Sequence, residues 1–483
     1  MYPLIVFLVS ALLCTLALLV FRGKRDSWFD VFLKSITVAF CALGFIRLWL
    51  PDGFAFVYNG AYINGENVKN ADFLQSILRW GAFASYSVLP MAVFYKGRFF
   101  RNVASYFCLP FSIACAFYFN DFMEYFLIDK RLGVHFDVSV WLRYTMFILE
   151  LALAISIPIL LQIKKRHYLD VKNPREWVKF IGGLLLIIPI TMPSYMLQSL
   201  IGFVDNDEPP ILGTMHIVWI IITLIFIIAL YYAFRFKSYE ERLMLCMFLT
   251  LVLFFEYNSF YLSGITIKRL PFQLCNIASY FYLIFMVFKL KKMFHFCFLA
   301  NIVGTIIAIF VFDLAEGYLC MNNVNYMIEH TLVLAIPALC MGLRIFPRVT
   351  LKSFKYYFIG FTSFFVSVFV LGTIFNARIE NKVDKVNYFY MLDRDFLFGR
   401  ENGIIKPLNF LQNWCVEIVG LEFYPLIPLV VYLGFTFGCF LFYLLVRYLY
   451  KFEDDHLALR RSSIDLYEKI SKKESKRPKD FID

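Results

Sequence analysis

The sequence predicts an all-α polytopic integral membrane protein with about 13 transmembrane helices. Hydrophobic residues make up 60% of its 483 positions, whereas charged residues make up only 17%. Apolar runs of about 20 residues recur along the chain, and this is the length that an α-helix needs to cross the hydrocarbon core of a bilayer. We therefore expect membrane lipids to be the main partners of the chain.

The distribution of charge argues against a nucleic-acid partner. The formal net charge is +11, but Lys and Arg cluster in short segments between the apolar runs and near the C-terminus. This pattern is typical of topological signals in membrane proteins. Most of the 11 cysteines lie inside apolar runs. No disulfide framework is therefore expected, although Cys320 and Cys415 lie in predicted outer segments and form one candidate pair.

The first apolar run, Tyr2–Phe21, has no basic residue before it and RGKRD directly after it. A cleaved signal peptide carries its positive charge in front, so the pattern predicts an N-terminal anchor, residues 1–26, with its N-terminus outside. Twelve further spans are expected at residues 27–50, 74–95, 102–119, 139–162, 177–203, 213–236, 240–263, 270–290, 294–316, 326–345, 352–376 and 424–450.

Basic residues in the connections set the predicted orientation. Connections after the odd-numbered spans, up to the eleventh, carry more Lys and Arg than those after the even-numbered spans up to the tenth. The first set is therefore assigned to the cytoplasm. The connection 377–423 is an exception with six basic residues, but it also holds seven acidic ones, and it is long enough to translocate despite its charge. We expect a multi-pass protein of the cell membrane with a cytoplasmic C-terminus.

An internal repeat organises the middle of the chain. Residues 84–100 align without a gap on residues 278–294, and shorter matches follow in the same order. This predicts two parallel six-helix repeats, residues 27–239 and 240–452, after the anchor. The basic cytoplasmic tail, residues 453–483, is expected to act as an orientation signal or, alternatively, to bind anionic lipid.

The two predicted repeats differ where chemistry would be located. Cys275 aligns with Gly81, and His330 aligns with Tyr144, so at these positions only the second repeat carries a thiol and an imidazole. Both are expected at the same depth below the outer membrane boundary. A Cys beside a His has a general base at hand and can hold an acyl group as a thioester. Each residue alone is more often a packing group.

Other polar residues gather in the second repeat. Gln273 and Asn276 flank the cysteine, while Glu256 and Asp313 lie in neighbouring predicted spans. Ionisable groups in lipid are costly and tend to face a bundle interior. We therefore expect these four residues to line a substrate pocket open to the outer leaflet, with Glu256 or Asp313 orienting the imidazole.

Two arginines of the first repeat, Arg79 and Arg143, lie near the outer ends of their spans. The residue types favour pairing with Glu150 or snorkelling to the interface, and a phosphate headgroup site is a further hypothesis.

Three short motifs together resemble a known family. LPFQLC (Leu270–Cys275), the His330 of IEHTLVL 55 positions later, and NYFYM (Asn387–Met391) are similar in order and spacing to the pattern of YwaF-type membrane proteins. The resemblance covers residues 240–452, and it departs from the pattern at Gln273, where the family often has His.

That family is related to an animal transmembrane family to which cysteine-dependent acyl transfer between phospholipids is attributed. The resemblance implies that Cys275 accepts the acyl group and that His330 is its base. It also places Asn387 and Tyr388 near the site, where they either bind a headgroup and polarise a carbonyl or cap a helix end.

Two classes of function fit the sequence. The first is acyl transfer or acyl hydrolysis on phospholipids near the outer leaflet; the alternative is a multi-span transporter or small-molecule binding protein. A membrane-embedded assembly factor is a third class. The sequence contains no GxxxxGK[ST], HExxH, CxxC pair or GxSxG motif, so no cofactor or metal is expected, and a nucleotide-driven pump, a zinc protease or a common serine lipase lacks support.

Overall fold

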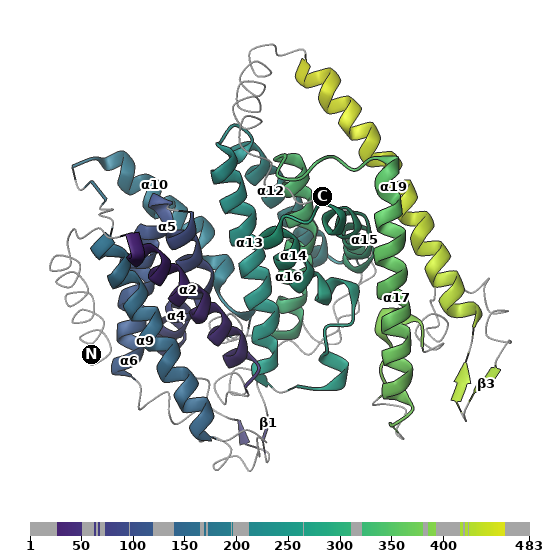
Figure 1. Ribbon diagram of the computed structural model, residues 1–483, viewed down its shortest axis with the longest axis horizontal. Coiled ribbons are helices and arrows are strands. Elements are labelled where there is room, and N and C mark those ends of the chain that lie inside the picture. Colours follow the sequence, from purple (N-terminus) through teal and green to yellow (C-terminus); the bar gives the residue numbers. More distant parts are fainter. Residues whose placement is uncertain are drawn as a thin grey trace. The chain divides into compact units, whose positions relative to one another are not determined.

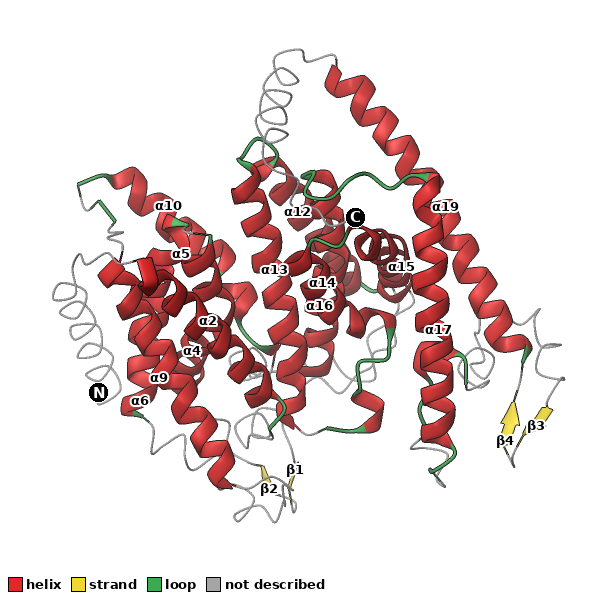
Figure 2. Cartoon of the chain, in the orientation of Figure 1, coloured by secondary structure: helices red, strands yellow, loops and turns green. Residues whose placement is uncertain are grey.

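The structure is a computed structural model, and helices form nearly all of its described part (Figure 2). It describes residues 27–50, 62–63, 66–67, 73–95, 97–118, 140–164, 169–170, 172–194, 196, 212–263, 265–310, 321–379, 385–392, 416–418, 421–423 and 425–458. The predicted N-terminal anchor, the candidate Cys320–Cys415 pair and most of the basic tail lie outside these residues.

The chain divides into two compact units. Unit 1 takes its described residues from Met1–Ile220, Leu243–Ile265 and Asp313–Leu332. Unit 2 takes its described residues from Ile221–Arg242, Thr266–Phe312 and Val333–Asp483. Segments of the two units alternate along the chain. The predicted repeat boundary between residues 239 and 240 stays a prediction.

Unit 1 contains the first helices, drawn in purple and blue in Figure 1. Helix α2 packs against α4 and α9, and α4 packs against α6. A π-helical turn, Ala104–Cys108, joins α5 to α6 in one continuous helical segment. The helices that lie wholly in this unit are α2 (Ser27–Leu48), α4 (Phe73–Phe94), α5 (Arg98–Val103), α6 (Leu109–Phe117), α9 (Val140–Lys164) and α10 (Pro174–Ile187).

Three helices begin in one unit and end in the other. They are α12 (Thr214–Phe234), α13 (Tyr239–Ser259) and α16 (Met321–Gly342). Most of α13 and the first half of α16 belong to unit 1, while the second half of α16 belongs to unit 2.

Unit 2 is built around α15, which packs against α14, α17 and α19. Its helices are α14 (Leu274–Phe288), α15 (Lys291–Phe310), α17 (Phe354–Asn376) and α19 (Leu426–Ala458). The structure also contains two short antiparallel hairpins: β1 (Tyr62–Ile63) with β2 (Glu66–Asn67) in unit 1, and β3 (Val416–Ile418) with β4 (Leu421–Phe423) in unit 2.

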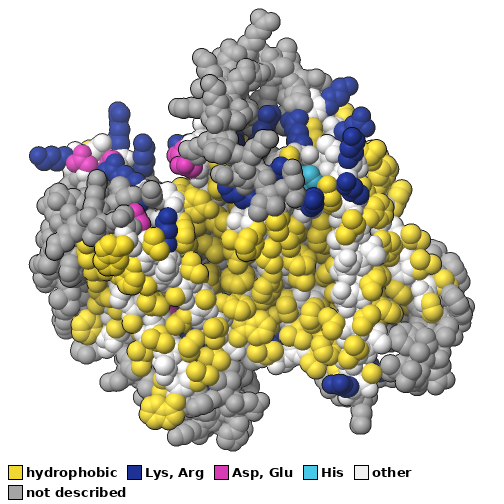
Figure 3. Space-filling view, viewed as in Figure 1, with side chains coloured by type: hydrophobic (Ala, Val, Ile, Leu, Met, Phe, Trp, Pro, Cys, Tyr) yellow, Lys and Arg dark blue, Asp and Glu magenta, His cyan; other side chains and the backbone are white. Residues whose placement is uncertain are grey.

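The helices have the length and surface of membrane spans. Ten helical segments of the described chain are long and apolar enough to cross a bilayer. Large apolar side chains cover much of the surface in Figure 3. On α12, for example, Ile221, Ile222 and Ile225 are exposed. Such surfaces are stable when lipid covers them, so the structure indicates a multi-pass membrane protein in contact with lipid.

Two predicted spans overlap short helices in the structure. The span expected at 177–203 corresponds to α10, which has 14 residues and ends at Ile187, because Pro189 cannot continue the helical hydrogen-bond pattern. The span expected at 270–290 corresponds to α14, which has 15 residues and ends at Lys289 in a left-handed conformation (φ 53°), a common way to terminate a helix.

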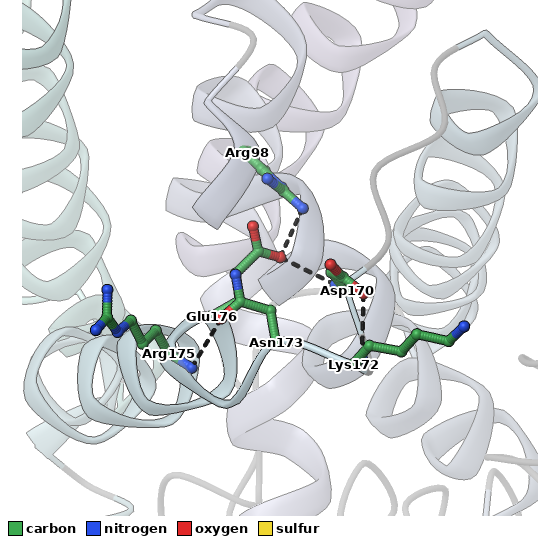
Figure 4. A network of polar contacts seen from close by, with 6 residues as sticks. All are labelled: Arg98, Asp170, Lys172, Asn173, Arg175 and Glu176. Atoms are coloured by element: carbon green, nitrogen blue, oxygen red, sulfur yellow. Dashed lines mark hydrogen bonds and ion pairs between the residues drawn. The ribbon is translucent and has the colours of Figure 1, made fainter.

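Polar contacts hold the start of α10 (Figure 4). The Asn173 side chain accepts a hydrogen bond from the Arg175 N–H at 3.2 Å and thereby caps the helix. The Glu176 carboxylate pairs with Arg98 at 2.7 Å and accepts from the Asp170 N–H at 2.9 Å. These exposed groups suit an aqueous surface, and the predicted cytoplasmic assignment of this end stays a prediction.

A close approach between α2 and α4 gives the first testable prediction. A Cβ at Gly44 would lie 2.1 Å from a ring carbon of Tyr86, and the Tyr86 ring is stacked between Phe40 and Phe255 at 5.0 and 4.7 Å. Gly44→Ala should therefore lower the free energy of unfolding by about 1–3 kcal/mol through overpacking. The change is read as a lower thermal midpoint in detergent.

Gly182→Ala in α10 is the matched control. Nothing lies within 4 Å of a Cβ at Gly182, so the substitution should be neutral or stabilise by up to about 1 kcal/mol through helix propensity. Equal thermal midpoints for the two variants would contradict the packing described for α2 and α4.

Candidate functional site

The start of α14 places Cys275 in the first turn of a helix. Gln273 is the N-cap residue with an extended backbone (φ −79°, ψ 150°), and Leu274 and Cys275 are the first two helical residues. The N-terminal end of a helix carries the positive end of its dipole, which favours negative charge nearby. A thiolate at this position is therefore stabilised, as a nucleophilic cysteine requires.

Cys275 is more accessible than most described cysteines. Its side chain is half-buried, as is that of Cys41, whereas the other described cysteines are buried. The thiol donates a hydrogen bond to Asn276 Oδ1 at 3.1 Å. Asn276 thus lies beside the candidate nucleophile, as the sequence predicts from its position.

Gln273 joins the start of α14 to residues 385–392, the segment that holds the NYFYM motif. Its Oε1 accepts a hydrogen bond from the Phe389 N–H at 2.8 Å, and its Nε2 donates to the Asn387 carbonyl at 3.4 Å. Two motifs that are far apart in the sequence therefore meet in unit 2. Both ends of the Gln273 amide serve this link, so the side chain positions the site, and its role as a substrate contact stays a prediction.

Contacts with α17 hold the same segment. The Asn376 side chain forms two hydrogen bonds with the backbone of Val386, at 2.9 and 2.8 Å. A Cβ at Gly372 would lie 2.3 Å from the Leu392 side chain, so the glycine permits this close approach. Phe389 has φ 53°, a left-handed conformation that costs a non-glycine residue about 1–2 kcal/mol. The Gln273 hydrogen bond to its N–H stabilises that conformation.

Asn387 and Tyr388 use their polar atoms within the fold. Asn387 Oδ1 accepts from the Leu392 N–H at 2.9 Å. The Tyr388 hydroxyl donates to the Ile267 carbonyl, and its ring lies 5.2 Å from the Phe272 ring. Burial raises the pKa of Tyr388 to about 12. These contacts lie within unit 2, and both the capping and the headgroup-binding interpretations of the two residues stay predictions.

A polar face of α15, which sequence reasoning missed, lies against the start of α14. Asn301 Nδ2 donates to the Leu274 carbonyl at 3.3 Å. Asn301 Oδ1 and the Thr305 hydroxyl are buried and have no hydrogen-bond partner among the described residues. Gly304 lies between them and lets Leu274 approach, because a Cβ there would be 3.2 Å from the Leu274 side chain. This face can hold a hydroxyl group or water.

The signal for this face is present in the sequence. Asn301 and Thr305 lie four positions apart in the predicted span 294–316, so they share one side of a helix. A polar pair on one side of an otherwise apolar span indicates a helix contact or a ligand.

Tyr282 connects α14 to the second half of α16 within unit 2. It is fully buried, and its hydroxyl donates to the Val333 carbonyl at 2.9 Å. Tyr282 follows Cys275 by seven residues on α14, so both side chains lie on one face of that helix. The interior next to the cysteine is therefore polar as well as apolar.

His330 lies in unit 1, in the first half of α16. It is buried, its ring stacks on Tyr326 at 3.9 Å, and Nδ1 lies 2.7 Å from the Tyr326 carbonyl. A carbonyl oxygen only accepts, so Nδ1 carries the proton and Nε2 of the neutral imidazole is the acceptor. This is the form that a general base requires. Because Cys275 belongs to unit 2, the pairing of the two residues stays a prediction.

The expected orienting carboxylate is not at His330 Nδ1, because the backbone carbonyl of Tyr326 holds that nitrogen. Glu256 is buried in unit 1 and accepts a hydrogen bond from the Ser194 N–H at 2.8 Å. Asp313 lies outside the described residues. The role of these two carboxylates in a substrate pocket stays a prediction.

Arg79 and Arg143 are both buried in unit 1, and their pairing with Glu150 stays a prediction. Glu150 pairs with Arg47, with 3.9 Å between Nε and Oε2. The guanidinium of Arg79 lies 5.4 Å from the centre of the Phe147 ring, and Arg143 is fully buried. Arg143 therefore does not snorkel to the surface.

These observations define an all-helical, multi-pass membrane protein with a half-buried cysteine at a helix start. Within the described part of the chain, no group of three or more His, Cys, Asp or Glu side chains could hold a metal ion. Residues 211–433 match the model of the TMEM164 family, the animal family related to acyltransferases. The match includes Gln273, Cys275, His330 and Asn387, whereas the YwaF-type assignment stays a prediction. No curated protein and no solved structure matches the chain.

The Gln273 link gives a prediction for local stability. Gln273→Ala removes both hydrogen bonds to residues 385–392 and leaves the Phe389 N–H without its acceptor, which should cost about 1–3 kcal/mol. Hydrogen exchange at this segment should become faster. Ser279→Ala is the control, because among the described residues its hydroxyl donates to the Asn276 carbonyl of the same helix and not to residues 385–392. Unchanged exchange at residues 385–392 in Gln273→Ala would contradict the link.

Tyr388 gives a pH-dependent prediction. Its pKa is raised by burial to about 12, against about 10 in an unfolded chain. Its neutral form therefore stabilises the folded state below about pH 10, and this contribution is lost as the pH rises through about 12. The absorbance of tyrosinate is measured against pH in the native protein and in Tyr388→Phe. The difference between the two titration curves should appear near pH 12. Its appearance near the ordinary value would show that the phenol is solvated.

Proposed function

We propose that the chain transfers or hydrolyses phospholipid acyl groups within the membrane, with Cys275 as the acyl carrier and His330 as its base. The observation that carries the proposal is the position of Cys275, half-buried in the first turn of α14 and held beside the NYFYM segment through Gln273. The similarity of residues 211–433 to the TMEM164 family supports the same class of reaction.

The reaction divides into two balanced steps. In the first, His330 Nε2 takes the thiol proton, and the Cys275 sulfur attacks the ester carbonyl of a phospholipid. The ester C–O bond breaks, a thioester forms, and the leaving lysophospholipid oxygen takes the proton from the imidazolium. In the second, a hydroxyl of a lysophospholipid or water loses its proton to His330 and attacks the thioester, and the thiol is released with that proton.

The polar face of α15 supplies groups for the acceptor. Asn301 Oδ1 is a buried acceptor, and the Thr305 hydroxyl can donate or accept. Together they suit an alcohol or water held next to the start of α14. The outer-leaflet placement of the site, and the choice between a lipid alcohol and water, are parts of this proposal.

A label-transfer assay tests the proposal. Purified protein in lipid is incubated with acyl-labelled phosphatidylcholine and an unlabelled lysophospholipid. Cys275→Ala should abolish transfer, and His330→Ala should slow it by about 10²–10⁴-fold, the usual contribution of a general base. Cys41→Ala is the matched control, because Cys41 is the other half-buried cysteine among the described residues. Unchanged transfer in both Cys275→Ala and His330→Ala would refute the proposed site.

A further inference from the structure

One end of unit 2 carries exposed Lys and Arg side chains, away from Cys275. Helix α14 has Cys275 in its first turn and ends at Phe288, about 20 Å further along the helix axis. Helix α15 begins next, at Lys291. Figure 3 shows Lys and Arg side chains gathered at the upper edge of the apolar surface. The basic surface of unit 2 is defined by five exposed residues on α15, α17 with the 3₁₀ turn before it, and α19: Lys292, Lys352, Lys355, Arg447 and Lys451.

Contacts within unit 2 bring these elements together. His295, in the second turn of α15, donates from Nε2 to the Pro347 carbonyl at 3.4 Å, and its ring lies 6.2 Å from the Tyr356 ring on α17. The guanidinium of Arg348 lies 4.5 Å from the centre of the Tyr450 ring on α19. Helix α15 also packs against both α17 and α19. The five cations therefore share one end of the unit.

Positive charge exceeds negative charge at this end. Residues 235–242, 289–292, 344–355 and 447–455 hold 12 Lys and Arg residues against five Asp and Glu residues. Within the described part of the chain, no residue of the basic surface forms an ion pair. Lys355 instead lies 4.9 Å from the centre of the Tyr356 ring. The surface therefore has a charge that an anion outside the protein can balance.

Two helix starts add to this positive charge. Lys292 lies in the first turn of α15 and Lys355 in the first turn of α17, and neither first turn contains an acidic residue. The N-terminal end of a helix is the positive end of its dipole, so a cation there is unfavourable and an anion is favourable. An anionic group bound beside these lysines interacts favourably with both the ammonium groups and the dipoles.

A buried imidazole lies between the two helix starts. The side chain of His295 is 8% exposed, and its Nδ1 has no hydrogen-bond partner among the described residues. Because Nε2 donates to a carbonyl, Nδ1 of the neutral ring is an acceptor. A hydroxyl of a bound headgroup, or a water molecule, can donate to it.

Apolar side chains next to the cations favour a lipid as the partner. Leu351, Tyr448 and Phe452 are 61%, 67% and 51% exposed, and each directly neighbours a residue of the basic surface in the sequence. Apolar and aromatic side chains beside Lys and Arg are typical of the zone where headgroups meet acyl chains. A free phosphate ion or an acidic protein segment would balance the charge and leave these apolar side chains in water.

We propose that the basic surface of unit 2 binds the phosphate groups of anionic phospholipids. The surface lies at the opposite end of α14 from Cys275 and involves no covalent step, so the proposal is independent of acyl transfer. It also uses none of the tail residues 453–483, for which binding of anionic lipid stays a separate prediction.

The first test measures thermal unfolding of the full-length protein in detergent with added phosphatidylglycerol, phosphatidylcholine, inorganic phosphate or polyglutamate. A ligand that binds only the folded state raises the unfolding midpoint. We expect a saturable rise of several degrees with phosphatidylglycerol, and a smaller rise in about 0.5 M NaCl because salt screens exposed charges. An equal rise with phosphatidylcholine, or a larger rise with phosphate or polyglutamate, would overturn the proposal.

A double variant connects the response to the surface. Lys352→Gln with Lys355→Gln should raise the half-saturating concentration of phosphatidylglycerol about 10-fold or more, because each cation at an anionic membrane surface contributes to binding. Without lipid, the variant should be at least as stable as the unaltered protein, since it removes a cation from a helix start. Lys172→Gln with Lys179→Gln is the matched control, because both lysines are exposed in unit 1. The control should respond like the unaltered protein.

A direct measurement covers a variant that fails to fold. Radiolabelled phosphatidylglycerol should remain with the unaltered protein through gel filtration in detergent. Its retention should be saturable, and unlabelled phosphatidylglycerol should displace it whereas phosphatidylcholine should not. The proposal is also overturned if the labelled lipid is not retained, if phosphatidylcholine displaces it equally, or if the double variant binds it like the control.

Discussion

The side-chain amide of Gln273 is the contact on which the arrangement around Cys275 depends. One amide accepts from the Phe389 N–H and donates to the Asn387 carbonyl, and it thereby ties a helix start to a segment more than 100 positions later. Without it, the left-handed Phe389 would lose the acceptor that satisfies its N–H. The N-cap position of the same residue also sets where α14 begins and hence where the thiol lies.

A second constraint acts on the whole protein, because lipid offers no hydrogen bonds to a polar side chain. Many buried polar side chains form a hydrogen bond within their own helix, as the Thr37 hydroxyl does with the Leu33 carbonyl at 2.8 Å. Some buried polar atoms have no hydrogen-bond partner among the described residues, and Asn301 Oδ1 and the Thr305 hydroxyl of unit 2 are two of them. Unsatisfied groups at such depth are costly. This cost is the physical reason why we expect the Asn301 and Thr305 face to hold a hydroxyl group or water.

Much of the helical architecture could be predicted from the sequence, because long apolar runs have one stable form in lipid. The shared location of LPFQLC and NYFYM could be anticipated only through a resemblance, since no local pattern reveals that Gln273 reaches Phe389. Helix α10 ends early because of Pro189. From sequence alone, a proline within an apolar run can either end a helix or only kink it. Asn301 and Thr305 carry no charge, so a search for ionisable side chains in apolar runs does not detect them. The hydrogen bond between His330 Nδ1 and a backbone carbonyl depends on the orientation of the imidazole ring, which the neighbouring sequence does not determine.

The central claim is that Cys275 carries the acyl group, and mass spectrometry tests it most directly. Purified protein is incubated with phosphatidylcholine of one chain length and no acceptor, then digested and analysed for acyl adducts. The account expects a hydroxylamine-sensitive adduct of that chain on the peptide that contains Cys275, and its absence in Cys275→Ala. Acyl transfer that proceeds without any adduct on this cysteine, or with the adduct on another residue, would contradict it.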